Sequence, residues 1–590
     1  NISFGTSQYT YEGAAAKQTL IDTYGWTITD GGQAVVPEFV FSINTENISS
    51  GSSASNQFKL PLSSNFIDAV VDWGDGTSDT ITASNQAEAT HTYSVSGEYT
   101  IKMTGVVIGW MFNGQGDRLK LLNVLNWGVF NLSTPLAFHS CTNFNSSATD
   151  SPTVSTNNLG ATFYNCQNFN GYIGNWDISS VTSFYSTSAF GRGMFEGATS
   201  FNQPLDNWNV SNVSDMRYCF ENSPSFNQSL NSWNTSSVND MSYMFNGATS
   251  FNGDVTSWDV SNVTNMSYMF NSAKAFNKDI TVWNTSSVTS MFAMFNDADA
   301  FAIDVDVTGW DISNVTNIGR LFSSTAFNQD ITNWNVSNVT SMQGLFASSP
   351  FDQDISSWNV SNVTDMSYMF ESATAFNQLI GVWNVNNVTN MRFMFSGAIF
   401  DQPIGSWNVS NVANMQGMFG SVYNHVKTMF NQDISSWDVS SVTNMGAMFT
   451  NATEFNQPIG SWDVSNVTVM NTGFNGGMFR NASSFNQPLN NWDISNITSI
   501  REMFEQTSFK QPLDSWDVSG ITNMVNAFKY IDINQSGNTA NYDNTLISWA
   551  SQNLQSGVTF NAGTSQYSLG GAAEAARNTL INTYGWTITD

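Results

Sequence analysis

FNQPLDNWNVSNVSDMRYCF (201–220) is one copy of a motif that recurs through most of the chain. Another copy reads FDQDISSWNVSNVTDMSYMF (351–370), and the consensus is F-N-Q-x-[LI]-x-x-W-[DN]-[VI]-S-[NS]-V-T-x-M-x-x-M-F. The chain has 590 residues, and about 16 such copies, or coils, fit between residues 118 and 530. Periods of 20 to 50 residues are typical of proteins built from stacked units that share one core.

A tryptophan marks each regular coil, and most neighbouring tryptophans are 24 or 25 residues apart. Two wider gaps place short insertions at 420–426 (GSVYNHV) and near 471–476 (NTGFNG). We predict that these tryptophans form a buried core ladder: Trp176, Trp208, Trp233, Trp258, Trp283, Trp310, Trp334, Trp358, Trp383, Trp407, Trp437, Trp462, Trp492 and Trp516.

The two halves of a coil have different apolar periods. The stretch from Leu205 to Val210 is short and bounded by Asn and Ser, which predicts a strand of three to five residues. Apolar residues at 213, 216, 219 and 220 share one face of a two-turn helix, and Ser211 can cap its N-terminus. The sequence therefore predicts an α/β repeat solenoid with a parallel strand ladder and short helices.

Four segments are expected along the chain. Residues 36–104 lack the period and contain several short runs of alternating apolar residues around Gly/Asp turns, which predicts an all-β sandwich. Residues 105–530 form the repeat solenoid, and residues 531–590 form a C-terminal cap that ends in a helix and the strand TITD. Residues 1–32 are a separate segment.

The opening and closing segments resemble each other. FGTSQYTYEGAAAKQTLIDTYGWTITD (4–30) parallels FNAGTSQYSLGGAAEAARNTLINTYGWTITD (560–590), so that Trp26 corresponds to Trp586. We expect residues 1–32 to be the closing segment of a preceding unit in a tandem array. Their partner is then a neighbouring copy, either in the same chain or in a bundle of chains.

The residue that follows each marker tryptophan has a short polar side chain. It is Asp in seven coils and Asn in seven, so the position needs an acceptor and not a charge, as in an Asx turn. We expect no calcium ladder along the repeats. Asp72 and Asp75 in the sequence DWGDGT could bind calcium, but a tight turn is the favoured interpretation. The Asn-Val-Thr triplets fit a glycosylation pattern and are interpreted as turn and cap residues.

Composition argues against several functions. The 17 basic and 46 acidic residues give a net charge of −29, which disfavours binding to nucleic acid. We find no apolar run of about 18 residues, so membrane insertion is not expected. The three histidines, His91, His139 and His425, share no metal-ligand spacing, and no catalytic motif is found. We therefore expect no enzyme and no cofactor.

The chain has three cysteines, of which Cys141 and Cys166 form a possible pair. Both follow a Phe by three residues and lie 25 residues apart, so we expect them side by side on adjacent coils. A disulfide and a pair of buried thiols both remain open.

The repeated motif resembles the bacterial surface-protein repeat of about 25 residues found in BspA-like leucine-rich-repeat surface proteins. VVDWGDGTSDTI and HTYSVSGEYTI resemble parts of a PKD-type sandwich. The resemblance implies a leucine-rich-repeat-like fold and an extracellular, cell-surface protein used in attachment, without catalytic residues.

Two functions are compatible with these observations. The first is structural and adhesive, with the chain as a segment of a long cell-surface fibre or stalk. The alternative is a binding module that recognises a glycan or a host or prey surface protein through the solenoid face. Exposed aromatic residues beyond the core set would favour binding, and the sequence places nearly all aromatic residues at core positions.

Overall fold

The computed structural model describes residues 1–8, 11–32, 37–64, 68–188, 191–301, 305–421, 426–473, 476–534 and 538–590. The chain divides into two compact units. Unit 1 comprises Asn1–Val238 and Gly247–Trp258, and unit 2 comprises Asn239–Asn246 and Asp259–Asp590.

The chain opens with a small β-α-β element. Strand β1 (Ile2–Ser3) pairs in parallel with β2 (Ile28–Thr29), and helix α1 (Tyr11–Tyr24) connects them. Gly25 follows the helix with φ +64°, a left-handed conformation that ends many helices, and its N–H donates to the carbonyl of Ile21 (3.0 Å). The predicted separate segment over 1–32 is thus a folded element.

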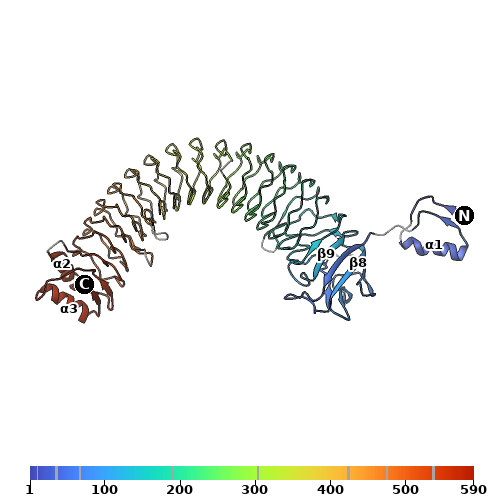
Figure 1. The fold of residues 1–590 in the computed structure, drawn as a ribbon, viewed down its shortest axis with the longest axis horizontal. Helices are drawn as coiled ribbons and strands as arrows, with labels where there is room; N and C mark the ends of the chain where they lie inside the picture. The colour runs from blue at the N-terminus through green and yellow to red at the C-terminus, as the bar shows by residue number, and fades with distance from the viewer. Residues whose placement is uncertain are drawn as a thin grey trace. The chain divides into compact units, whose positions relative to one another are not determined.

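A six-stranded sheet lies at the centre of the N-terminal region (Figure 1). Its strands are β3 (Phe39–Asn44), β5 (Asp68–Asp72), β6 (Ser78–Ile81), β8 (Glu98–Val106), β9 (Leu121–Asn126) and β11 (Asn145–Ser146), in the order β11-β9-β3-β8-β5-β6. A separate two-stranded sheet joins β4 (Gln57–Lys59) to β7 (Thr90–Thr92), which follows the 3-10 helix η1 (Ala87–Ala89).

The predicted sandwich over 36–104 is wrong. The larger sheet does not stop at residue 104, because β3 pairs with β8 on one side and with β9 on the other. Strand β11 then adds to β9 in parallel and carries the sheet into the first degenerate coils. The separate sheet of β4 and β7 has only two strands among the described residues, so it cannot supply the large second layer of a sandwich.

Short strand pairs accompany the degenerate coils of unit 1. Strand β10 (Asn131–Leu132) pairs in parallel with β12 (Thr153–Val154), and β13 (Tyr185–Ser186) pairs antiparallel with β14 (Arg192–Gly193). The regular coils that follow contain neither helices nor longer strands among the described residues.

The predicted two-turn helix of each coil is also wrong, because a left-handed residue interrupts it. Twelve coils have a φ of 54° to 62° at the position of Tyr218: Tyr218, Tyr243, Tyr268, Ala293, Arg320, Gly344, Tyr368, Phe393, Gly417, Ala447, Glu502 and Asn526. In 201–220, the N–H of Cys219 reaches back three residues to Met216 (3.3 Å) instead of four. Successive turns of this kind still place the apolar residues on one face, so the spacing imitates a helix.

The predicted strand over 205–210 is wrong as well, because that stretch forms a turn without strand pairing. Each regular coil has a single β-bridge, and it lies in the half that was predicted to be helical. Examples are Ser183 with Asp215 in unit 1 and Asn265 with Ser290 in unit 2. Alternate N–H groups also donate to the next coil: Met266 to Ser290, Tyr268 to Phe292 and Phe270 to Met294, at 2.8–3.0 Å. The α/β solenoid of strands and helices is therefore the wrong fold class. Turns stacked by isolated bridges replace it.

The chain closes with one further helix and a second β-α-β element (Figure 1). Helix α2 (Ala540–Ala550) precedes β15 (Thr559–Asn561), α3 (Ala572–Asn582) and β16 (Thr587–Thr589), and β15 pairs in parallel with β16. The sequence predicted α3 and β16, and it missed α2 and β15. Trp549 of α2 donates its indole N–H to the carbonyl of Leu513 (3.2 Å), so α2 takes the place of a coil.

Candidate functional site: ladders that join neighbouring coils

The marker tryptophans join each coil to the coil before it. All fourteen are buried, each with at most 4% of its surface exposed. In unit 1 the rings of Trp208 and Trp233 stack with centroids 6.4 Å apart. An indole N–H donates to a Leu, Ile or Val carbonyl of the preceding coil, at 2.9–3.3 Å, in Trp208, Trp233, Trp258, Trp310, Trp334, Trp358, Trp383, Trp407, Trp437, Trp462, Trp492 and Trp516.

The residue after each tryptophan closes an Asx turn. Its side-chain oxygen accepts the backbone N–H two residues on at 2.9–3.2 Å in all fourteen coils, with Asp and Asn alike. At Asp259 and Asp463, the hydroxyl and the N–H of the Ser two residues on lower the pKa of the carboxyl. These carboxylates therefore act as the hydrogen-bond acceptors that close the turns.

The Asn-Val-Thr triplets form two further ladders, which sequence reasoning missed. The Asn amide donates to a carbonyl of the preceding coil at 2.7–2.8 Å in Asn212, Asn314, Asn338, Asn362, Asn387, Asn411, Asn466 and Asn496. The Thr hydroxyl does the same at 3.0–3.3 Å in Thr264, Thr289, Thr316, Thr340, Thr364, Thr389, Thr443, Thr468 and Thr522. The triplet recurs in nearly every coil, and this recurrence could have indicated that its side chains contact the neighbouring coil.

Cys141 and Cys166 lie at equivalent positions of adjacent coils. The rings of Phe138 and Phe163, three residues before each cysteine, stack with centroids 5.7 Å apart. Both cysteines are free and buried, and the thiol of Cys166 donates to the carbonyl of Phe138 (2.9 Å). Burial raises the pKa of both thiols, so they stay protonated and unreactive.

Asp72 and Asp75 belong to one tight turn. Asp72 accepts the N–H of Gly74 (3.0 Å), and Gly74 itself has φ +79°. Asp75 accepts the hydroxyl of Thr77 (2.6 Å) and the ring nitrogen of His91 lies 2.9 Å away. Burial opposes ionisation of Asp75, but the contacts with Thr77 and His91 outweigh it and lower the pKa. Both carboxylates are thus occupied by the turn.

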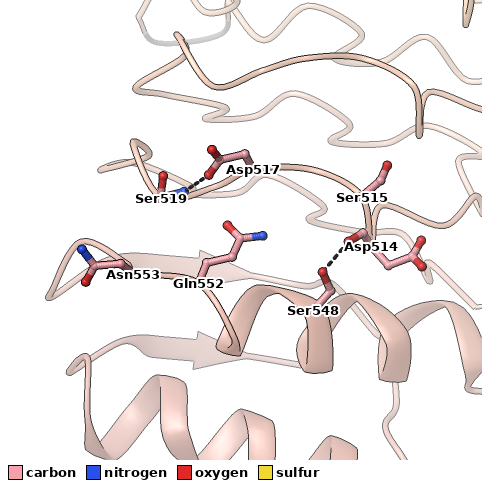
Figure 2. Close-up of a pocket in the computed structure, with 7 residues that line it drawn as sticks. All are labelled: Asp514, Ser515, Asp517, Ser519, Ser548, Gln552 and Asn553. Carbon is pink, nitrogen blue, oxygen red and sulfur yellow. Dashed lines mark hydrogen bonds between the residues drawn. The ribbon is translucent and has the colours of Figure 1, made fainter.

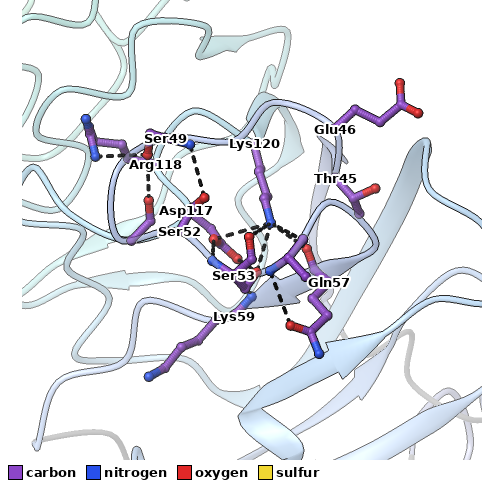
Figure 3. A network of polar contacts seen from close by, with 12 residues as sticks. Thr45, Glu46, Ser49, Ser52, Ser53, Gln57, Lys59, Asp117, Arg118 and Lys120 are labelled. Atoms are coloured by element: carbon purple, nitrogen blue, oxygen red, sulfur yellow. Dashed lines mark hydrogen bonds and ion pairs between the residues drawn. The ribbon is translucent and has the colours of Figure 1, made fainter.

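A buried ion pair between Asp117 and Lys120 was not predicted (Figure 3). Both side chains are fully buried, with 3.4 Å between the charged atoms. Lys120 donates to the carbonyls of Ala54 and Gln57 (2.8 Å each) and to Ser53, while Asp117 accepts the N–H of Ser53 and of Lys59. Burial lowers the pKa of Lys120, and Asp117 opposes the shift. The pair fastens the loop before β4 to the chain before β9.

A shallow depression lies between the last coil and α2 (Figure 2). It is lined by Asp514, Ser515, Asp517, Ser519, Ser548, Gln552 and Asn553. Asp517 accepts the N–H of Ser519 (2.9 Å), Ser548 donates to the carbonyl of Asp514, and Gln552 donates to the carbonyl of Trp516 (2.8 Å). Its polar groups hold α2 against the last coil.

Within the part of the chain that the structure describes, titratable side chains gather in ion pairs, as at Arg480 with Glu502 and Glu505. No group of three or more His, Cys, Asp and Glu residues is placed to hold a metal ion within that part of the chain. Partial burial lowers the pKa of His139 to about 4, and His91 contacts Asp75. His425 lies outside the described residues. Within the same ranges no helix has the length and hydropathy needed to cross a bilayer.

Comparison with known proteins identifies the repeat family. The model of the family DUF285, described as a Mycoplasma protein of unknown function, matches residues 131–235, 189–307, 302–399, 380–477, 423–541 and 476–578. These overlapping matches tile more than half of the chain, so the chain belongs to this family and is a tandem-repeat protein. No curated protein and no solved structure matched the chain.

Proposed function

We propose that the chain is an extracellular structural and adhesive protein, a segment of a long cell-surface fibre or stalk used in attachment. The observation that carries the proposal is the set of ladders. Neighbouring coils in each unit are joined at the same places by backbone, Trp, Asn and Thr hydrogen bonds, repeated coil after coil. A protein built this way gains length by adding coils and needs no single reactive centre.

The surface chemistry supports the same proposal. Only 11% of the residues are charged, and the exposed acceptors are mostly Asn, Ser and Thr already engaged in turns. Hydrogen bonds between such uncharged groups change little with salt concentration, whereas exposed ion pairs are weakened because salt screens their charges. The motif's resemblance to repeats of BspA-like surface proteins, and that of the DWGDGT segment to PKD-type domains, supports an extracellular location.

Recognition of a glycan or of a host or prey surface protein through the repeats is less well supported. A binding face rich in exposed aromatic rings is the usual means of such recognition. Among the described coil residues, the exposed large aromatic side chains are Tyr172 (39%) and Tyr530 (62%). The other exposed large apolar residues are scattered aliphatic ones such as Val282, Val382 and Leu379.

Surface labelling and an attachment assay test the proposal. Antibodies raised against residues 105–530 should label intact producing cells and lose their target when the cells are shaved with protease. Cells that lack the gene should attach less. A gene missing one whole coil, residues 335–358, should restore attachment, since the proposed role does not depend on a single coil. Labelling only after permeabilisation, or normal attachment without the gene, would contradict the proposal.

A further inference from the structure

The first and last elements of the chain are two copies of one β-α-β fold. In the first, Ile2 pairs with Ile28 and Ser3 with Thr29; in the second, the equivalent residues pair as Phe560 with Ile588 and Asn561 with Thr589. An ion pair ties each helix to the end of the element, Lys17 with Asp30 (3.0 Å) and Arg577 with Asp590 (2.7 Å). The glycine after the first strand is left-handed in both, with φ +62° at Gly5 and +71° at Gly563.

The second copy covers the end of the coils in unit 2. Phe560 forms a bridge with Met524 of the last coil, and its ring lies 5.5 Å from that of Trp549 in α2. Backbone bonds join the element to the coil, from Phe528 to Asn561 (3.0 Å) and from Thr564 to Ile531 (2.9 Å).

Polar side chains complete this junction. Trp586 donates its indole N–H to the carbonyl of Gln555 (2.9 Å), Tyr584 donates to that of Gln552 (2.8 Å), and Tyr542 of α2 donates to Asp590 (2.8 Å). Coil, helix and connecting loop over residues 524–555 thus form one receiving surface for the β-α-β element. An element that binds this surface must therefore offer an apolar face, an indole N–H and a carboxylate at its end.

The first copy carries the same groups, but its apolar face is open. Phe560 and Trp586 are 0% and 3% exposed, whereas their equivalents Ile2 and Trp26 are 38% and 43% exposed. Phe4, which replaces the buried Ala562, is 56% exposed. Tyr24, the equivalent of Tyr584, is 67% exposed. Large apolar side chains gathered on one face of a soluble element usually mark an interaction site.

We propose that this face of residues 1–32 docks onto the end of another array of such coils, one whose last coil is not already covered by its own β-α-β element, through a surface like that of residues 524–555. Residues 558–590 show inside this chain what such an occupant looks like and which groups it offers. In the complex Trp26 takes the position of Trp586 and donates to a loop carbonyl, and Asp30 takes that of Asp590 and accepts a tyrosine hydroxyl. The contact is heterologous, head to tail, because it joins two different surfaces.

The inference adds an assembly contact to the proposed structural role, and its test with purified protein does not depend on where the protein acts. A variant that ends at residue 557 exposes the receiving surface, and Trp26→Asp in the same variant prevents it from binding itself. Mixed with the intact chain, this variant should form a one-to-one complex by size-exclusion chromatography with light scattering. Trp26→Asp in the intact partner should weaken the complex at least about tenfold, because a buried Trp is a typical anchor.

Val95→Asp is the matched control in the intact partner, because Val95 is 67% exposed and belongs to the same unit outside the β-α-β element. It should leave the complex unchanged. A folded truncated variant that does not bind the intact chain, or binds Trp26→Asp equally well, overturns the proposal.

A grafted chain decides the question if the truncated variant does not fold. Residues 2–30 replace residues 560–590 in the intact chain, so that the first copy is offered directly to the receiving surface. The graft should restore cooperative unfolding and shield the grafted Trp26 from iodide quenching. A second graft that carries Trp26→Asp should not. If the grafted chain is as unfolded as the truncation, residues 1–32 do not recognise this surface and the proposal is wrong.

Discussion

Trp358 joins two coils in two ways. Its ring is 4% exposed in the core of unit 2, and its indole N–H donates to the carbonyl of Ile331 in the preceding coil (3.2 Å). The bond satisfies a buried donor and a buried acceptor together, and leaving either unpaired costs about 1–3 kcal/mol. Each marker tryptophan that makes this bond therefore fixes the register of its coil as well as filling volume in the core.

Substitution of tryptophan by phenylalanine separates these two roles. Trp358→Phe should lower the free energy of unfolding by about 1–2 kcal/mol more than Trp176→Phe. Trp176 is equally buried, but its indole nitrogen has no hydrogen-bond partner, so its replacement loses area alone. Urea unfolding of both variants measures the difference. Equal losses would show that the hydrogen bond adds nothing to stability.

Glu196 gives unit 1 a pH-dependent stability near neutrality. Burial raises its pKa to about 7 from 4.5, with the N–H of Gly193 opposing the shift, Glu221 adding to it and Arg192 opposing it. A carboxyl group whose pKa is higher in the folded protein binds its proton more tightly there. It therefore stabilises the fold fully at pH values below its pKa in the unfolded chain, and this contribution is lost as the pH rises through about 7. Relative to Glu196→Gln, the wild type should lose about 2–3 kcal/mol between pH 4.5 and pH 8. Parallel pH profiles of unfolding free energy would contradict this.

The Asx turns should not need calcium. Asp463 accepts the N–H of Ser465 (3.1 Å), and Asn359 accepts that of Ser361 (3.2 Å) in the same way. The carboxylate and the amide therefore accept the same hydrogen bond in the turn. We expect the unfolding midpoint of unit 2 to be unchanged by a chelator, and Asp463→Asn to change stability by less than about 0.5 kcal/mol at pH 7. Below the usual carboxyl pKa, the wild type should lose more stability than Asp463→Asn, because Asp463, whose pKa the Ser465 bonds lower, is then protonated. A chelator-induced loss in the repeats would refute the assignment.

At the scale of a coil, the left-handed residues decide the backbone. Besides the position of Tyr218, a second position four residues on has φ from 52° to 70°, as at Asn222, Gly247, Ser348 and Gly397. Most residues at these places are not glycine, although the left-handed conformation costs about 1–2 kcal/mol for other residues. Bonds between coils hold them in place, such as Ser348 N–H to the carbonyl of Glu371 (2.7 Å).

Ser348 offers a direct measure of that conformational cost. It is exposed and has φ +55°, while Gly397 occupies the same place in another coil. Ser348→Gly should therefore raise the free energy of unfolding by up to about 1 kcal/mol, after the larger entropy of unfolded glycine is subtracted. Ser348→Val should lower it by about 1–2 kcal/mol, because a branched side chain fits this conformation poorly. Chemical unfolding measures both, and a stabilising Val variant would refute the assignment.

The same residues explain what the sequence could and could not reveal. The spacing of the tryptophans and the Asp/Asn alternation predicted the burial of Trp334 and the turn after it, because both depend on one position in each coil. The prediction of a helix in each coil was wrong because residues such as Tyr243 and Glu502 are compatible with helices but adopt a left-handed conformation here. Their N–H groups donate to carbonyls of the neighbouring coil, a contact that the sequence does not reveal. The role of Trp549 was missed because α2 lacks the rest of the motif.

At the scale of the molecule, the coils behave as interchangeable parts within a unit. Removal of residues 335–358 joins Trp334 to Asn359, the equivalent of Asn335, and leaves each ladder one step shorter. The variant should fold with an unchanged circular dichroism signal per residue and a modestly lower midpoint. Removal of residues 335–346 alone breaks the register and should abolish cooperative unfolding. Equal behaviour of the two variants would show that register does not control the stack.

The tryptophan bonds also have a direction. Trp334, Trp358 and Trp383 each donate to a carbonyl that was synthesised about 27 residues earlier, at 3.1–3.3 Å. The Asn and Thr ladders point the same way, as Asn362 and Thr364 show. The carbonyl groups that accept these side-chain bonds are therefore already synthesised when a new coil leaves the ribosome. Folding can follow synthesis coil by coil, because each of these contacts joins residues close in sequence.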